Sequence, residues 1–152
     1  MADDKQYMAV ALKEAQGAFD DDEVPVGAVV VHNGRIIARA HNQMRRLKDP
    51  TAHAEMIAIT QAAAYLKSER LLDAAVYVTI EPCSMCAGAM VLARVKRLVY
   101  GAADPKTGAC GSLMNIADDR RLNHRINISR GVLEAESGML LKEFFKKKRL
   151  KK

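Results

Sequence analysis

The chain has 152 residues, of which 49% are hydrophobic, so it can bury the core of one domain and is too short for two ordinary domains. Its apolar runs, such as residues 26–31, are far shorter than the ~20 residues of a membrane-spanning helix, and residues 1–5 lack the pattern of a secretory leader. We therefore expect one cytoplasmic domain with no membrane partner.

The net charge of +6 lies at the C-terminal end of the sequence. Residues 146–152 contain six Lys or Arg and no acidic residue, which leaves 18 basic against 18 acidic residues in the rest of the chain. This contrast divides the chain into a domain of residues 1–145 and a basic tail of residues 146–152. A flexible arm that binds phosphate groups and a solvated tail that only aids solubility both fit the pattern.

Hydrophobic periodicity and turn residues predict helices and strands along the chain. In chain order we expect a helix over residues 7–19, antiparallel strands over 26–32 and 35–41, a polar loop over 42–50, a helix ending near 66, a strand over 75–80, a helix over 83–94, a strand over 95–100, a loop over 101–123, a strand over 126–129 and a helix from 133. A strand, a helix and a strand in succession imply parallel pairing, so the predicted fold class is α/β with a mixed sheet.

Local signals refine three of these segments. Asn33-Gly34 tolerates positive φ and suits a two-residue type I′ turn between the first two strands. Thr51 can cap the helix that carries His53 and Glu55 in its first turn. The segment 101–123 is long for a connection within one domain, so we interpret it as a loop that lines a site or contains a short helix.

Two short motifs contain the residue types that hold zinc. Cys83 and Cys86 stand three apart at the start of a predicted helix, where both sulfurs lie on one face, close to exposed amides that favour thiolates. His53 also lies at a helix start, and helices that pack on a parallel sheet begin at the same sheet edge. Three ligands leave one position open for water, as in catalytic zinc, which lowers the pKa of that water enough to supply hydroxide near neutral pH. Hydroxide can attack an electron-poor ring carbon that bears an amine.

Glu55 is the predicted proton carrier, because a carboxylate can take a proton from water and pass it to a ring nitrogen and to departing ammonia. Positions two apart in a regular helix point in nearly opposite directions, so His53 and Glu55 can share a site only if the metal lies beyond the helix end. Two alternatives stay open for the cysteines. They could form a redox pair, or a fourth ligand could close a structural zinc site; the candidates are Cys110, His32, His41 and His124.

Both motifs belong to longer segments that resemble those of a known protein family. These are residues 23–28, 49–55, 82–90, 106–108, 111–114 and 123–125. Through them the chain resembles, from about residue 5 to residue 147, the bacterial tRNA adenosine deaminases of the TadA type in the cytidine deaminase-like superfamily. The resemblance implies a three-layer α/β/α fold with about five strands and one Zn²⁺ per subunit. It also implies a homodimer that converts adenosine to inosine, by hydrolysis, at the anticodon wobble position of tRNA.

The same resemblance implies which residues contact the RNA. They are Asn42 as hydrogen-bond partner of the flipped nucleotide, Val26 with the backbone near Ala54 and Pro82 as pocket lining, Asp104, Lys106 and Ser112 in a loop that meets the RNA, and Phe144 and Phe145 beside flanking bases. Each assignment has a structural alternative. Asn42 could cap a loop, Val26 could be strand core, and at least one of Phe144 and Phe145 is expected to pack inward.

A tRNA substrate would give the basic tail a role, because docking on a folded RNA needs phosphate contacts before the base is read. Two other functions remain open on the sequence. One is a deaminase of free nucleobases or nucleotides, which would use the same metal and Glu55. The other is a non-enzymatic RNA-binding module with structural zinc, in which Glu55 would have no catalytic role. No organic cofactor is expected in any of these.

Overall fold

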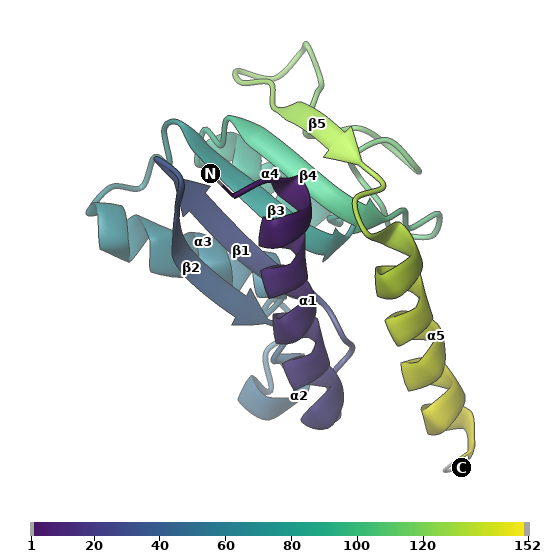
Figure 1. The fold of residues 1–152 in the computed structure, drawn as a ribbon. Helices are drawn as coiled ribbons and strands as arrows, with labels where there is room; N and C mark the ends of the chain where they lie inside the picture. The colour runs from purple at the N-terminus through teal and green to yellow at the C-terminus, as the bar shows by residue number, and fades with distance from the viewer. Residues whose placement is uncertain (1, 151–152) are drawn as a thin grey trace.

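Helices and strands follow one another along residues 2–150, which the computed structural model describes (Figure 1). The elements are α1 (Asp4–Asp20), β1 (Gly27–His32), β2 (Arg35–His41), α2 (Met44–Leu47), α3 (Ala54–Leu66), β3 (Ala74–Ile80), α4 (Ser84–Leu92), β4 (Arg97–Ala102), β5 (Asn127–Arg130) and α5 (Glu134–Leu150). None of the helices in this described part is long and apolar enough to cross a membrane.

The five strands form one mixed sheet in the order β2-β1-β3-β4-β5. β1 pairs antiparallel with β2 and with β3, whereas β3, β4 and β5 pair parallel to one another. The hairpin between β1 and β2 turns at Asn33-Gly34, whose φ values of 51° and 75° confirm the predicted turn. β2, β3 and β4 therefore all end at the same edge of the sheet, which is the edge where α3 and α4 begin.

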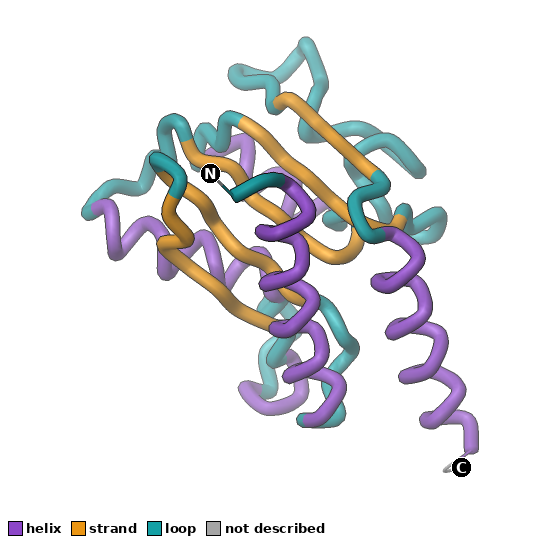
Figure 2. Tube along the Cα trace, in the orientation of Figure 1, coloured by secondary structure: helices purple, strands orange, loops and turns teal. Residues whose placement is uncertain are grey.

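Helices cover both faces of the sheet, α1 and α5 on one face and α3 and α4 on the other (Figures 1 and 2). Alternate residues of the central strands point to opposite layers. Val76 and Val78 pack in the larger core cluster against α3 and α4, while Tyr77 packs with Val29 and Val99 against α1. Both faces are thus apolar, and the predicted three-layer α/β/α architecture is confirmed.

The two helices that carry the metal motifs begin later than the sequence predicted. α3 begins one residue after His53, which is the N-cap and has an extended backbone (φ −73°, ψ 151°). The predicted Thr51 cap is wrong, because the Thr51 hydroxyl donates to Asp49 at 2.7 Å instead. α4 begins one residue after Cys83, which is also an extended N-cap (φ −76°, ψ 177°). Both residues consequently stand just outside their helices.

Two connections also differ from the prediction. The predicted polar loop 42–50 contains α2, a single helical turn that hydrophobic periodicity cannot reveal in so few residues. The segment 103–126 contains no helix; isolated bridges from Gly108 to Cys83 and from Cys110 to Asn115 give it its shape. β4 begins two residues later than expected.

The C-terminal basic segment is helical as far as the structure describes it. α5 continues to Leu150, so residues 146–150 are part of a helix, which neither of the two alternatives, a flexible arm or a solvated tail, describes; residues 151 and 152 lie outside the described chain. Two contacts fix this last part of α5. The Lys148 ammonium lies 2.6 Å from a carboxylate oxygen of Asp22, and the Lys147 ammonium lies 5.3 Å from the centre of the Phe19 ring.

Candidate active site

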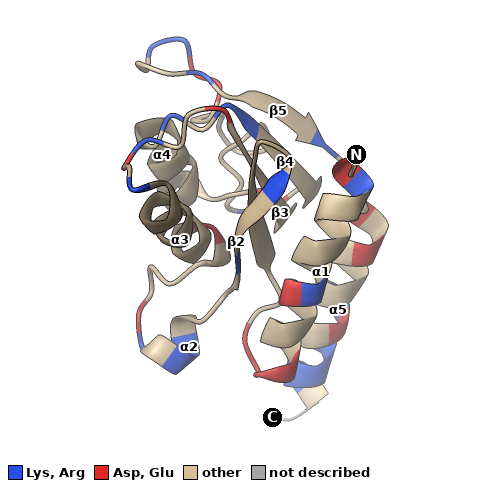
Figure 3. Ribbon diagram, turned by 60° about the vertical axis from the view of Figure 1, so that its left-hand side comes forward, with Lys and Arg blue, Asp and Glu red and all other residues tan. Residues whose placement is uncertain are grey.

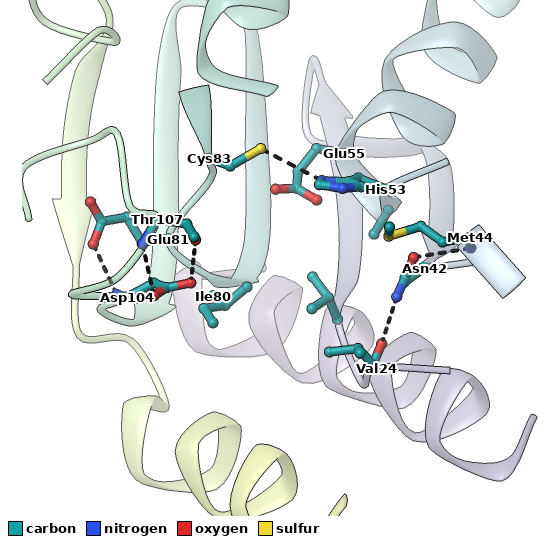
Figure 4. A pocket seen from close by; sticks show the side chains of 12 residues that line it. Val24, Asn42, Met44, His53, Glu55, Ile80, Glu81, Cys83, Asp104 and Thr107 are labelled. Atoms are coloured by element: carbon teal, nitrogen blue, oxygen red, sulfur yellow. Dashed lines mark hydrogen bonds between the residues drawn. The ribbon is translucent and has the colours of Figure 1, made fainter. Parts of the chain in front are cut away.

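His53, Cys83 and Cys86 converge at the sheet edge where β3 ends (Figure 4 shows His53 and Cys83). The Nδ1 atom of His53 lies 3.6 Å from the Cys83 sulfur and 3.5 Å from the Cys86 sulfur. All three ligand atoms lie within 4.8 Å of one another, and within residues 2–150 they form the group of His, Cys, Asp or Glu side chains suited to a metal ion. The predicted metal ligands are therefore brought together.

The capping positions of His53 and Cys83 explain this convergence. An extended N-cap residue directs its side chain off the end of the helix, so His53 points past α3 toward the start of α4. Cys86 lies within α4, with no exposed surface, and faces back toward Cys83. The concern that His53 and Glu55 diverge is resolved in the same way, since only Glu55 is helical and both side chains line one pocket.

The spacing of the ligand atoms fits zinc. A tetrahedral zinc site with Zn–S bonds of ~2.3 Å and Zn–N bonds of ~2.0–2.1 Å places nitrogen and sulfur about 3.5 Å apart. The two distances from His53 to the cysteine sulfurs match this value. The donor set of one imidazole and two thiols is also one that zinc prefers.

The proposed fourth protein ligands lie elsewhere. The Cys110 sulfur is buried and lies 3.9 Å from the backbone oxygen of Pro82, outside the ligand group. His41 contacts Glu14 at 3.3 Å, and His124 contacts the Val95 carbonyl at 2.6 Å, both away from the cysteines. The closed structural site is therefore not favoured by the described residues.

Glu55 lies beside the ligand group and is 3% exposed (Figure 4). Burial raises the pKa of its carboxyl group to about 7. The pKa of the neighbouring Cys83 thiol shifts in the opposite direction. Hydrogen bonds from Cys86 and His53 lower it to about 3. A carboxyl group with this pKa suits proton transfer near neutral pH, and a thiolate suits the binding of a cation.

A pocket of about 170 Å³ opens onto the ligand group. Its lining consists of Val24, Val26, Asn42, Met44, His53, Ala54, Glu55, Ile80, Glu81, Cys83, Asp104 and Thr107. The predicted lining residues Val26, Ala54, Asn42 and Asp104 are among them. Pro82, Lys106, Ser112, Phe144 and Phe145 are not, so those five lie outside the pocket itself.

Asn42 lies at the pocket and hydrogen-bonds to its neighbours in the fold. Its side chain is buried at the pocket, where its Nδ2 donates to the Val24 carbonyl at 3.3 Å and its Oδ1 accepts from the backbone N–H of Met44 at 3.2 Å. The second bond satisfies the backbone N–H of the first residue of α2, whose N-cap is Gln43. Asn42 therefore ties together two pocket-lining segments that are 18 positions apart.

Two buried glutamates hold the walls of the pocket, and no sequence motif points to either role. Glu23 accepts from the backbone N–H groups of Arg45 and Arg46, at 3.0 and 2.8 Å, at the start of α2. Glu81 accepts from the loop that follows β4, including Ser112. Burial opposes the charge of Glu81, yet hydrogen bonds from Ser112 and from loop amides keep the pKa of its carboxyl group below the usual value.

The two C-terminal aromatic residues differ from each other. Phe144 is 3% exposed and packs edge-on against Phe19, with ring centres 5.8 Å apart, so inward packing is confirmed for this residue. Phe145 is 45% exposed and stacks edge-on against Phe144. Only Phe145 presents a ring to solvent.

Comparisons with known sequences extend over the whole domain. Residues 2–149 match the family model of the MafB19-like deaminases. The tRNA-specific adenosine deaminase of Bacillus subtilis (strain 168) is 51% identical over 152 residues, which cover 100% of this chain and 94% of that protein. The tRNA-specific adenosine deaminase of Aquifex aeolicus (strain VF5) is 49% identical over 143 residues, which cover 94% of each chain.

Comparisons with solved structures also find deaminases. A chain studied for A-to-I editing by tRNA:A34 deaminases at the wobble position of transfer RNA superposes with a TM-score of 0.86 at 47% identity, over 89% of this chain and 98% of that one. A guanine deaminase from Nitrosomonas europaea superposes with a TM-score of 0.82 at 25% identity, over 95% and 85% of the two chains. Because the likeness spans the segments that contain both metal motifs, the chain belongs to the MafB19-like deaminases and to the family of the bacterial tRNA-specific adenosine deaminases.

Proposed function

We propose that this chain deaminates adenosine to inosine, by hydrolysis, at the wobble position of a tRNA anticodon. The observation that carries the proposal is the convergence of His53, Cys83 and Cys86 beside the buried Glu55, in a chain 51% identical to a tRNA-specific adenosine deaminase. The wobble position is supported by the structural likeness to a tRNA:A34 deaminase.

In this proposal His53, Cys83 and Cys86 hold one zinc ion per chain. Zinc bound there would lower the pKa of water, so that hydroxide is available near neutral pH. Glu55 takes one proton of the attacking water and delivers it to the ring nitrogen of adenine, where it stays in the product. Glu55 then takes the remaining proton of the added hydroxyl group and delivers it to the amino group, which leaves as ammonia while the ring carbon becomes a carbonyl. Its place in the first turn of α3, at the pocket wall, keeps the carboxyl group beside the ligands and out of bulk water.

Asn42 is proposed to hydrogen-bond to the flipped nucleotide. Val26 and the backbone near Ala54 and Pro82 are proposed to form the surface on which the flipped base packs. The position of Asn42 at the pocket supports this role. Flipping suits an enzyme that acts on one base of a folded RNA, because a base within a stack does not reach a buried carboxylate.

The RNA around that nucleotide is proposed to rest on the loop with Asp104, Lys106 and Ser112 and on Phe145. Basic residues of α2 and of the last turns of α5 support this proposal (Figure 3). The last turns of α5 are linked to α2 because Asp22 contacts both Lys148 and Arg45. Phe144 is left out because it is buried.

A homodimer working in the cytoplasm completes the proposal. An apolar surface on α4 supports the dimer: Leu92 is 77% exposed, and Leu122, at 41%, lies on the same surface with Met56 and Met85. Exposed apolar patches of this kind commonly mark protein interfaces. The molar mass of the purified protein by light scattering, for the natural chain and for Leu92→Asp, tests the dimer.

Sequencing tests the reaction. The purified, zinc-loaded chain is incubated with a tRNA that has adenosine at the wobble position, and inosine is detected as guanosine after reverse transcription. We expect conversion of the wobble adenosine and no change in the other adenosines. Free adenosine and guanine are assayed in parallel. Deamination of guanine with an unchanged tRNA would contradict the proposal and favour a free-base enzyme.

A further inference from the structure

We infer that Glu81 is a positioning residue, which fixes the loop of residues 104–112 as one wall of the substrate pocket. The identity of the substrate rests on the proposed function, whereas the wall itself rests on contacts within the structure. Glu81 is 2% exposed, follows the last residue of β3 and lines the pocket together with the metal ligand Cys83.

The Glu81 carboxylate accepts hydrogen bonds from three separate positions of this loop. Its Oε1 accepts from the Asp104 backbone N–H at 3.0 Å and from the Ser112 hydroxyl. Its Oε2 accepts from the backbone N–H groups of Cys110 and Ser112, both at 3.0 Å. Loop amides outside a strand ladder need acceptors from elsewhere, and a charged acceptor forms stronger bonds than a neutral one.

Gly108 shows how closely the loop backbone packs on this carboxylate. A Cβ atom at Gly108 would lie 2.5 Å from Oε1 of Glu81 and 2.5 Å from the backbone oxygen of Asp104, which is too close for carbon and oxygen. The Gly108 amide instead donates to that Asp104 oxygen at 2.8 Å. The loop therefore folds over Glu81 and leaves no room for a side chain between them.

The side chains that this anchor places are those of Asp104 and Thr107, which line the pocket. They are joined to each other, because the Thr107 hydroxyl donates to the Asp104 carboxylate at 2.7 Å (Figure 4 labels both). The ligands His53 and Cys86 are held separately by α3 and α4. Loss of the Glu81 carboxylate should thus release the wall while the ligand group keeps its geometry.

Glu81→Gln in the full, zinc-loaded chain tests the inference. Hydrogen exchange in the free protein should become about tenfold faster, or more, for amides of residues 104–112, and should stay unchanged for α3. With tRNA as substrate, KM should rise about tenfold while kcat changes less than about threefold, as expected when a binding wall is lost and the chemistry is kept. The zinc content should equal that of the natural chain.

Two further variants accompany Glu81→Gln, one as a control and one as a milder change of the same hydrogen bonds. Glu69→Gln changes an exposed glutamate and should match the natural chain in all three measurements. Ser112→Ala removes only the hydroxyl donor and should accelerate exchange of the loop by a smaller factor, about two- to threefold. It keeps the inference testable if Glu81→Gln does not fold.

The inference would be overturned if hydrogen exchange of the amides of residues 104–112 stayed unchanged in both Glu81→Gln and Ser112→Ala. Loss of zinc together with a large fall in kcat would also overturn it, because Glu81 would then support the metal ligands and not the wall. If the natural chain leaves tRNA unmodified, the proposed function fails by itself, and the exchange measurements still decide the role of Glu81.

Discussion

The ligand group and the pocket walls are built in different ways, although they meet at the same sheet edge. His53, Cys83 and Cys86 are placed by the first residues of two helices, so short stretches of sequence fix their geometry. The walls are placed by irregular segments whose amides converge on the distant carboxylates of Glu23 and Glu81. The ligand group thus depends on local structure, and the pocket walls depend on long-range hydrogen bonds.

This difference predicts two classes of variant. Changes in the ligand group should abolish the reaction for every substrate, because no other described group replaces a missing ligand. Changes in the walls should alter how strongly a substrate binds and should spare the metal.

The largest effect is expected from Cys86→Ala. Cys86 is fully buried, and its sulfur lies 3.5 Å from Nδ1 of His53, so its loss leaves two ligands. Bound zinc, measured by mass spectrometry, should fall from about one per chain to nearly zero, and inosine formation should cease. The melting temperature should also fall, because metal binding contributes to folding.

Cys110→Ala is the matched control for Cys86→Ala. Cys110 is equally buried, at 2% exposure, and lies outside the ligand group. This variant should keep its zinc. Loss of zinc in both variants would mean that Cys110 belongs to the site and would contradict the assignment of three ligands.

The next largest effect is expected from Glu55→Gln, which keeps the shape of the side chain and removes proton transfer. The rate at saturating tRNA should fall about a thousandfold, within the range for loss of an acid–base group. Zinc should remain bound. Glu136→Gln on the exposed surface of α5 is the control and should retain full activity. Deamination that persists in Glu55→Gln with zinc bound would show that another group carries the proton.

A tenfold effect is expected at the basic end of α5. The triple change of Lys146, Lys147 and Arg149 to Ala removes three charges and leaves the Lys148–Asp22 pair intact. The Kd for tRNA at low salt should rise about tenfold, and the slope of log K against log salt should become shallower by about 0.7–0.9 for each phosphate that the protein no longer neutralises. Filter binding over a range of salt concentrations measures both.

The control for this variant removes the same charge at the opposite edge of the sheet, with Lys5, Arg70 and Arg120 changed to Ala. These residues lie near the starts of α1, β3 and β5, away from the pocket. Equal losses of affinity in both triple variants would mean that net charge alone matters, and the surface proposed for the RNA would be wrong.

The smallest effect is expected from Glu23→Gln, which sharpens the comparison between the two walls. Glu23 holds the amides of Arg45 and Arg46, at the start of a helix of one turn, whereas Glu81 holds a whole loop. Loss of this acceptor should destabilise the fold by about 1–3 kcal/mol and raise KM about threefold. Urea unfolding and steady-state kinetics measure the two quantities. An increase in KM as large as that of Glu81→Gln would show that both walls contribute equally.

The sequence was sufficient for the features that depend on local spacing. The hairpin turn at Asn33-Gly34, the order of the strands along the chain and the convergence of His53 with the two cysteines follow from residues that are close in sequence or from the rules of parallel sheets. The starts of α3 and α4 were missed by one or two residues because extended N-caps look like helix in a periodic pattern.

The features that were missed depend on distant partners. Glu81 follows the strand predicted over residues 75–80, and its donors are 23 to 31 positions further along the chain. The segment 146–150 fitted either a flexible arm or a solvated tail, because its charge pattern does not show that Phe144 packs on Phe19 or that Lys148 contacts Asp22. Such pairings are decided by tertiary contacts and have no signature in a single sequence.

The contact of Asp22 with both Lys148 and Arg45 has a practical consequence for handling the protein. It joins the C-terminal helix to α2, whose Met44 lines the pocket, so a domain fused behind α5 would stand beside the entrance for the substrate. The other end of the chain lies far from that entrance, because Asp4 pairs with Arg97 at the start of β4 (Figure 1). Affinity tags, surface attachment points and fused targeting domains therefore belong at the N-terminal end.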